Sequence, residues 1–182
     1  MKKGFRKFIS LACMICVIAS CLVGCGKTPY DGEWAYIHDD KTLALKINGK
    51  TAEVDGVKCS VVAEGDVLKL KANDGSVFEV GPADGNGDIT LYKFTTYEYE
   101  GEGTPDSIVG NWKSKEKWSF EFTKEGTFNE DGYFPGHYSL DENNKTFSLM
   151  YNDHFIDTVC GYSIEGNELT IKYPWPMVKL AK

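Results

Sequence analysis

The chain has 182 residues, with 27 acidic and 20 basic side chains, so its formal net charge is -7 at pH 7. An acidic surface repels phosphate backbones, and the single arginine, Arg6, leaves the rest of the chain without a guanidinium to bind them, which excludes a nucleic-acid partner. This length suits one domain of modest size or two very small ones.

The N-terminus has the order of a secretory signal peptide. Residues 2–7 carry four basic side chains and no acidic one, and an apolar run interrupted only by Ser10 and Ser20 occupies residues 8–24. A cationic end followed by an apolar helix and small residues is typical of a segment that directs export and is then removed. We therefore expect the chain from residue 25 onward to lie outside the cytoplasm.

The export signal ends at Leu22-Val23-Gly24-Cys25. This tetrapeptide resembles the lipobox of bacterial lipoproteins, which implies that residues 1–24 are removed and that the Cys25 thiol carries a diacylated glyceride. Acyl chains contribute roughly 0.8 kcal/mol per buried CH₂, enough to hold a folded domain on a bilayer. The expected location is the extracytoplasmic face of the cell membrane, with the lipid bilayer as a partner. An unmodified Cys25 thiol or a retained leader, found by mass analysis of the exported chain, would contradict this.

Three other interpretations of this segment remain open, one of which is ordinary secretion without lipid attachment. Ile18-Ala19-Ser20-Cys21 fits the same pattern, although cleavage there would leave Leu22 and Val23 outside the membrane. The apolar run could also stay attached as an anchor, but it is shorter than the roughly 20 residues that a spanning helix needs. Cleavage before Cys25 removes four basic residues and no acidic one, so the 158 remaining residues carry a formal charge of -11.

The rest of the chain has the periodicity of β-strands. Apolar side chains alternate with polar ones over short runs, which places one face of each strand on a core and the other in water. Turns that contain glycine and asparagine separate the runs and are typical of antiparallel neighbours. We expect an all-β fold, an antiparallel up-and-down meander that forms a barrel or a sandwich. The runs with the clearest alternation are Leu43–Ile47, Leu68–Leu70, Trp118–Phe122, Phe147–Tyr151 and Leu169–Tyr173.

The sequence contains two related halves. Gly32-Glu33-Trp34 is repeated as Gly110-Asn111-Trp112, and Glu64–Leu70 is similar to Glu165–Ile171. The spacing grows from 78 residues in the first match to 101 in the second, which predicts an extra hairpin within residues 140–157. The predicted organisation is a lipidated tether (25–31), a first β repeat (32–100), a linker (101–107) and a second β repeat (108–182).

The second half carries the motifs of a known family. They are, in order, Gly110-x-Trp112, Phe120-x-Phe122, Gly126-Thr127-Phe128, Gly136-x-Tyr138 and Tyr162–Ile171. Together they resemble the small lipocalin-like domains of bacterial lipoproteins, well over residues 108–173 and more weakly over 31–97. The resemblance implies a cup-like β meander that sometimes holds a small apolar ligand, with no shared enzymatic activity.

Two cysteines lie in the exported part of the chain besides Cys25. Cys59 and Cys160 could form a disulfide, because an exported compartment permits one. Two buried free thiols are the alternative, since the sequence does not show whether the two Cα atoms come within the roughly 7 Å that a disulfide needs.

Motifs for catalysis and metal binding are weak. Asp84–Asp88 has oxygen ligands at alternate positions, but the glycine and carboxylate that a calcium loop needs further on are missing, so we expect a polar turn. His38, His137 and His154 have no partner at a metal-ligand spacing and are expected in solvated loops. The chain has no serine nucleophile elbow. We therefore predict no enzymatic activity, no metal and no other cofactor.

The tryptophans are the clearest candidates for binding. Trp34 and Trp112 are expected in the cores. Trp118 follows a lysine-rich segment and Trp175 stands between two prolines that interrupt strand pairing, so these two rings could face solvent and stack on a sugar or a peptide.

Taken together, the sequence predicts a membrane-anchored, non-enzymatic protein that binds a small molecule, a glycan or a partner protein of the cell envelope. The alternative is a structural, assembly or inhibitor-type lipoprotein that acts through protein contacts. An internal cavity lined by aromatic side chains would favour the first function, whereas closed cores and a flat exposed patch would favour the second.

Overall fold

The computed structural model describes residues 28–83, 87–153 and 157–181. In these ranges the chain forms 14 β-strands and no helix, as the period-two alternation predicts. Each strand is antiparallel to the next one along the chain, and β14 pairs with β1 to close the ring. The predicted all-β antiparallel meander is therefore confirmed.

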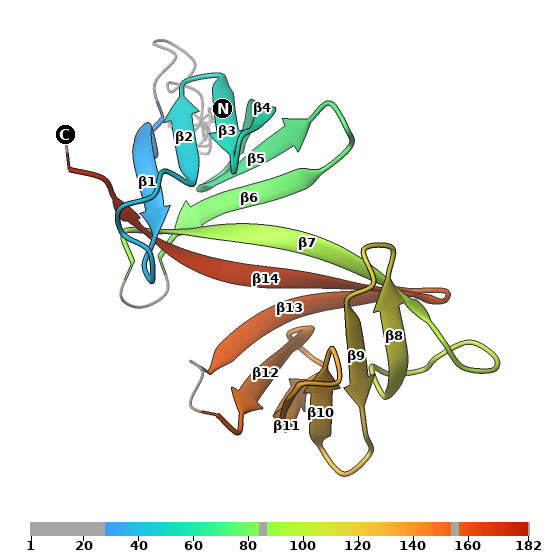
Figure 1. Cartoon of the computed structure of the whole chain (residues 1–182). Coiled ribbons are helices and arrows are strands. Elements are labelled where there is room, and N and C mark those ends of the chain that lie inside the picture. The colour runs from blue at the N-terminus through green and yellow to red at the C-terminus, as the bar shows by residue number, and fades with distance from the viewer. Residues whose placement is uncertain (1–27, 84–86, 154–156, 182) are drawn as a thin grey trace, which may run out of the picture.

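Each half of the chain contributes seven of the described strands and forms most of one lobe (Figure 1). The first-half strands are β1 (Gly32–Tyr36), β2 (Leu45–Asn48), β3 (Thr51–Val54), β4 (Val57–Glu64), β5 (Val67–Ala72), β6 (Val77–Pro82) and β7 (Ile89–Tyr99). The second-half strands are β8 (Gly110–Ser114), β9 (Ser119–Phe122), β10 (Thr127–Glu130), β11 (Phe134–Asp141), β12 (Thr146–Tyr151), β13 (Thr158–Glu165) and β14 (Glu168–Lys179).

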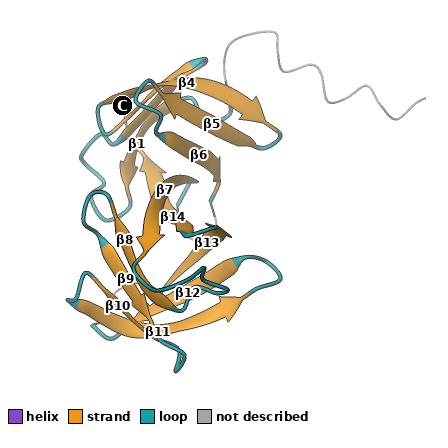
Figure 2. Cartoon of the chain, turned by 90° about the vertical axis from the view of Figure 1, so that its right-hand side faces the viewer, coloured by secondary structure: helices purple, strands orange, loops and turns teal. Residues whose placement is uncertain are grey.

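The last strand of each half runs from its own lobe into the other. β7 pairs with β6 through Ile89–Lys93 and with β8 through Tyr97–Tyr99. β14 pairs with β13 through Glu168–Lys172 and with β1 through Met177–Lys179. Because β7 and β14 also pair with each other, they divide the ring into a first barrel (β1–β7 and the end of β14) and a second barrel (β8–β14 and the end of β7), as Figures 1 and 2 show.

Alternating side chains fill the two barrels. In β2, for example, Leu45 and Ile47 are buried while Lys46 and Asn48 face solvent. The first core consists of Trp34, Ala44, Leu45, Ile47, Ala52, Val54, Cys59, Leu68, Leu70, Val80, Ile89, Leu91 and Met177. The second core consists of Tyr97, Ile108, Trp112, Phe120, Phe122, Phe128, Phe147, Leu149, Cys160, Leu169 and Ile171.

The exchanged strands carry residues of each half into the core of the other. Met177 belongs to the first core, although it lies in the range 108–182 predicted for the second repeat. Tyr97 belongs to the second core, although it lies in the range 32–100. Each core is therefore built from both halves of the sequence.

The two repeated tryptophans occupy equivalent positions, each as the third residue of the first strand of its half. The Trp34 indole donates a hydrogen bond from Nε1 to the Tyr30 carbonyl (2.9 Å), and the Trp112 indole donates one to the Ile108 carbonyl (2.7 Å). Both side chains are buried, at 3% and 0% exposed. The prediction that these two tryptophans lie in the cores is confirmed.

The similarity between Glu64–Leu70 and Glu165–Ile171 does not come from equivalent strands of the two halves. Glu64–Leu70 belongs to the β4–β5 hairpin, whose counterpart in strand order is β11–β12, whereas Glu165–Ile171 belongs to β13–β14. The two hairpins are similar because each uses a two-residue turn that begins with a left-handed glycine, Gly65 or Gly166. The extra hairpin predicted within residues 140–157 was wrong, because the described part of that segment is the end of β11 and the strand β12, which is the counterpart of β5.

The two described cysteines are free thiols, so the disulfide that the sequence allowed is not formed. Cys59 lies in the first core and Cys160 in the second. Burial raises the pKa of both thiols. The alternative of two buried, unreactive cysteines is therefore the one that the structure shows.

Candidate functional site

Packed aromatic rings occupy the interior of the second barrel. Phe120 and Phe122 are stacked with their ring centroids 5.2 Å apart, and Phe147 meets Phe122 edge to face at 5.6 Å. Trp112 is completely buried beside them. Since these rings already contact one another, an aromatic ring available to a ligand has to be sought on the outer surface.

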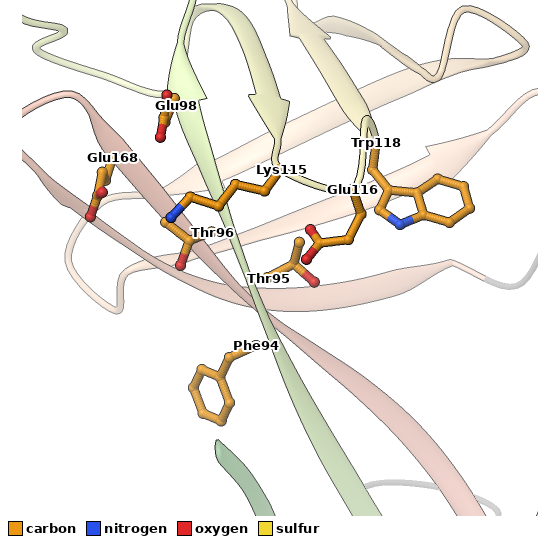
Figure 3. A pocket seen from close by; sticks show the side chains of 8 residues that line it. All are labelled: Phe94, Thr95, Thr96, Glu98, Lys115, Glu116, Trp118 and Glu168. Carbon is orange, nitrogen blue, oxygen red and sulfur yellow. The ribbon is translucent and has the colours of Figure 1, made fainter. Parts of the chain in front are cut away.

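A groove of about 370 Å³ lies on that surface, between the β8–β9 turn and the β7–β14 pair (Figure 3). Its size is at the lower end of small-molecule sites. In Figure 3, Lys115 and Glu116 reach from the turn toward β7, and Trp118 lies at one edge. The groove is lined by Phe94, Thr95, Thr96 and Glu98 of β7, Lys115, Glu116 and Trp118 of the turn, and Glu168 of β14.

The backbone below Trp118 is fixed by hydrogen bonds to one serine. The Trp118 amide donates to Ser114 Oγ (3.0 Å), the Lys117 amide donates to the Ser114 carbonyl (3.0 Å), and the Ser114 amide donates to the Trp118 carbonyl (2.8 Å). Lys117 has φ 74, in the left-handed region that costs a non-glycine residue roughly 1 kcal/mol. This turn therefore holds the backbone of Trp118 in a set position immediately before β9.

The Trp118 side chain is exposed, as the binding hypothesis requires. Its exposed fraction is 56%, whereas Trp112, six residues earlier on the same hairpin, is fully buried. An indole combines a large rigid face with one N–H donor, which is why tryptophan is frequent in binding surfaces.

Carboxylates outnumber cations in the groove. Glu98, Glu116 and Glu168 are exposed and face a single lysine, Lys115. Five ion pairs join lysines to carboxylates elsewhere in the described chain, but none involves these three glutamates. The groove is therefore an acidic site with one exposed aromatic ring.

Trp175, the other predicted contact residue, lies half-buried in a separate cluster. The expectation that its two flanking prolines interrupt strand pairing was wrong, because β14 continues through Pro174 and Pro176 and stays paired with β7. The Trp175 ring contacts Tyr36 (centroids 5.4 Å apart) and His38 (6.0 Å), and the Lys93 ammonium lies 5.2 Å from its centroid. Lys93 also forms an ion pair with Asp55 at 2.7 Å. Because its neighbours already cover this ring with protein groups, Trp118 offers the more accessible platform.

A half-buried acid, Glu130, lies at the end of β10 beside two tyrosines of the second barrel. Glu130 accepts a hydrogen bond from the Tyr151 hydroxyl (2.5 Å), and that hydroxyl is 2.9 Å from the Tyr173 hydroxyl. Burial raises the pKa of Glu130, the hydrogen bond from Tyr151 opposes this rise, and the nearby Asp131 adds to it. The native state therefore binds a proton at Glu130 more tightly than the unfolded chain does.

The raised pKa of Glu130 predicts that Glu130→Gln stabilises the protein at neutral pH. A raised native pKa means that the contribution of Glu130 to stability is greatest below the unfolded pKa and is lost as the pH rises through the native one. The amide keeps an acceptor for Tyr151 but carries no charge, so thermal unfolding at pH 7 should shift upward by on the order of 2 °C. The gain should shrink toward pH 4.

The exposed Glu121 provides the matched control, because its replacement by glutamine removes the same charge from the outer face of β9. Glu121→Gln should leave the thermal midpoint unchanged at both pH values. A loss of stability in Glu130→Gln at pH 7 would show that the charged carboxylate is favoured in place.

Several residues singled out in the sequence lie outside the described part of the chain. These are Cys25, His154 and residues 84–86 of the calcium-like segment. The other two histidines, His38 and His137, are exposed, but His137 lies in β11 and not in a loop as expected. Within the described residues, no group of three or more histidine, cysteine, aspartate or glutamate side chains is arranged to hold a metal ion.

The sequence predicted Trp118 but missed the strand residues of the groove. Glu98 lies three residues before the predicted linker (101–107), near the end of β7 and directly opposite Glu168 of β14. The continuing alternation of polar Thr96 and Glu98 with buried Tyr97 is the signal that could have extended the strand.

The fold and the groove define an all-β protein of two barrels joined by exchanged strands, with an acidic aromatic groove beside their junction. No protein-family model, curated protein or solved structure matches the chain. In residues 28–83, 87–153 and 157–181 there is no helix with the length and apolar character needed to cross a membrane.

Proposed function

We propose that this protein is a lipid-anchored, extracytoplasmic binding protein without enzymatic activity, and that it binds a glycan in the groove beside Trp118. The observation that carries this proposal is the exposed indole of Trp118 at the edge of a groove that also presents hydroxyl and carboxylate groups. A sugar ring needs these partners, because its C–H face packs on an aromatic ring while its hydroxyls need hydrogen-bonding groups.

The packing of the barrels supports binding on the surface rather than inside. Four large aromatic side chains of the second barrel are fully buried, namely Trp112, Phe120, Phe122 and Phe147. These rings pack against one another in the core, so they are not available to a ligand in the way that a lipocalin-like cup would require. A shallow polar groove with one platform suits a short stretch of a longer polymer.

The proposed anchor at Cys25 would keep the groove close to the membrane. A tether of residues 25–31, even if fully extended, spans no more than about 25 Å. The protein would therefore meet polymers that lie within a few nanometres of the bilayer surface.

The alternative function, a lipoprotein that acts through protein contacts, has one observation in its favour. Tyr133 is 81% exposed at the β10–β11 turn, and its neighbour Phe134 is also exposed. Tyrosine is enriched in protein interfaces. This turn provides a second, distinct aromatic surface against which the groove can be compared.

The glycan proposal predicts that Trp118→Ala weakens binding at least tenfold, which corresponds to about 1.4 kcal/mol, since loss of an aromatic hot-spot residue typically costs about 2 kcal/mol or more. The measurement is titration calorimetry of the whole exported chain with hexamers of glucose, of N-acetylglucosamine and of glucosamine. Tyr133→Ala removes an exposed ring from the other aromatic surface and should leave the affinity unchanged. Binding that survives Trp118→Ala, or no binding to any of the three hexamers, would overturn the proposal.

A further inference from the structure

The outer face of the β7–β14 pair carries an unusual row of like charges. Glu98 of β7 stands directly opposite Glu168 of β14, and Glu165 of β13 stands opposite Glu168 on its other side. Like charges at directly opposed positions destabilise a sheet. The three glutamates in a row across β7, β14 and β13 are therefore expected to destabilise this part of the sheet.

Elsewhere in the sheet glutamates stand opposite lysines, as Glu53 does opposite Lys46 and Lys58, whereas Glu168 has a glutamate on both sides. Lys113 lies opposite Glu98 on β8, yet its ammonium pairs with Glu100 instead, at 3.6 Å. Lys115 extends into the groove in Figure 3 without forming an ion pair with a described carboxylate. The charges of Glu98 and Glu168 are thus left for solvent or for a ligand that is itself cationic.

The same groove offers a second group that attracts cations. The face of an indole ring binds ammonium groups better than any other aromatic side chain, at roughly 0.5–1 kcal/mol when exposed and more when desolvated. Glu116 lies two residues before Trp118 on the same turn and lines the groove with it. An amine that entered the groove would therefore meet carboxylates as well as an aromatic face.

From this arrangement we infer that the ligand of the groove is an amino sugar polymer whose amines are free and protonated. This inference rests on the proposed glycan function and specifies that the bound glycan is positively charged. The Thr95 hydroxyl and the Trp118 ring accommodate the sugar, and Glu98 and Glu168 select the ammonium by charge-assisted hydrogen bonds. The Thr96 hydroxyl, which also lines the groove, is already within 3.1 Å of the Thr170 hydroxyl.

A comparison of two hexamers that differ only in acetylation tests the inference. At pH 5.5 and 50 mM salt, the glucosamine hexamer should bind the whole exported chain at least fivefold more tightly than the N-acetylglucosamine hexamer. The difference should fall below twofold at 0.5 M salt, because screening weakens exposed charge pairs. Titration calorimetry of both hexamers gives the ratio directly.

The double variant Glu98→Gln/Glu168→Gln separates selection from binding. It should lower the preference for free amines to less than twofold while leaving the affinity for the acetylated hexamer unchanged. Because the substitutions relieve like-charge repulsion, the thermal midpoint should stay the same or rise, which shows that the variant is folded. Glu125→Gln, which removes a carboxylate from the exposed β9–β10 turn, should keep the full preference.

The outcomes distinguish this inference from the proposed function. Equal affinity for the two hexamers, or an unchanged preference in the double variant, would overturn the amine selection but leave glycan binding intact. Failure of both hexamers and of the glucose hexamer to bind would overturn the proposed function itself. Binding of a lysine hexamer with no binding of the sugars would overturn the inference in favour of a basic peptide.

Discussion

Replacing Trp112 by alanine is expected to lower the free energy of unfolding by about 3–5 kcal/mol, the range typical of a buried tryptophan or phenylalanine. Trp112 is completely buried and packs against Tyr99, with the two ring centroids 5.1 Å apart. Its removal also leaves the buried Ile108 carbonyl without the indole donor that now lies 2.7 Å away. An unsatisfied buried carbonyl adds to the cost of the cavity. Urea unfolding followed by circular dichroism measures the change.

Trp118→Ala is the matched control, since it removes the same side chain six residues further along the same hairpin. More than half of the Trp118 surface is already in water, so its loss should change the free energy of unfolding by less than about 0.5 kcal/mol. Similar destabilisation by the two variants would contradict the assignment of one tryptophan to the core and the other to the groove.

The fold class could be predicted because its signals are local. Alternation such as Leu45-Lys46-Ile47 depends only on which side of a strand meets the core, and a glycine-x-tryptophan repeat marks the start of each barrel. In the structure Trp34 and Trp112 make the same hydrogen bond to the carbonyl four residues earlier. Short-range patterns of this kind do not depend on the order of the strands in the sheet, so they can be recognised from the sequence alone.

The exchange of β7 and β14 could not be predicted, because it depends on pairing between residues far apart in sequence. Nothing local in Ile89–Tyr99 shows that its first part pairs with β6 and its last part with β8. Hairpin turns misled the repeat alignment for the same reason, since Gly65 and Gly166 satisfy the same turn geometry in strands that are not equivalent. Turn chemistry specifies a hairpin but not its place in the sheet.

The candidate site was predictable only in part. A tryptophan in a charged segment pointed to Trp118, but the groove also needs Phe94, Glu98 and Glu168, which the β7–β14 pairing brings beside the turn. Trp175 has a comparable sequence context between prolines, yet the exchanged strand carries it against Tyr36 of the first barrel. Exposure of a ring is thus decided by long-range packing, which the local sequence does not show.

Ending the chain at Pro176 is expected to open the first barrel while leaving the second one closed. The truncation removes the three residues of β14 that pair with β1, and with them the buried Met177. Loss of a buried methionine alone costs roughly 2–5 kcal/mol. The amide of Leu180, which donates to the Glu33 carbonyl at 2.9 Å, is also lost. Hydrogen exchange should therefore speed up in β1 and β2, more than 100 residues away in sequence, while β12 and β13 keep their protection.

A chain that ends at Leu180 controls for the loss of the terminus itself, because it keeps Met177 and the pairing with β1 and should exchange like the intact protein. Met177→Asp tests the same closure without shortening the chain, since it places a charge in the first core. The Pro176 truncation and Met177→Asp are each expected to destabilise the first barrel through a change in β14, a strand of the second half of the sequence. Unchanged protection of β1 in the Pro176 truncation would contradict closure by β14, whereas equal loss of protection in β12 would show that the shared strands make the two barrels unfold as one.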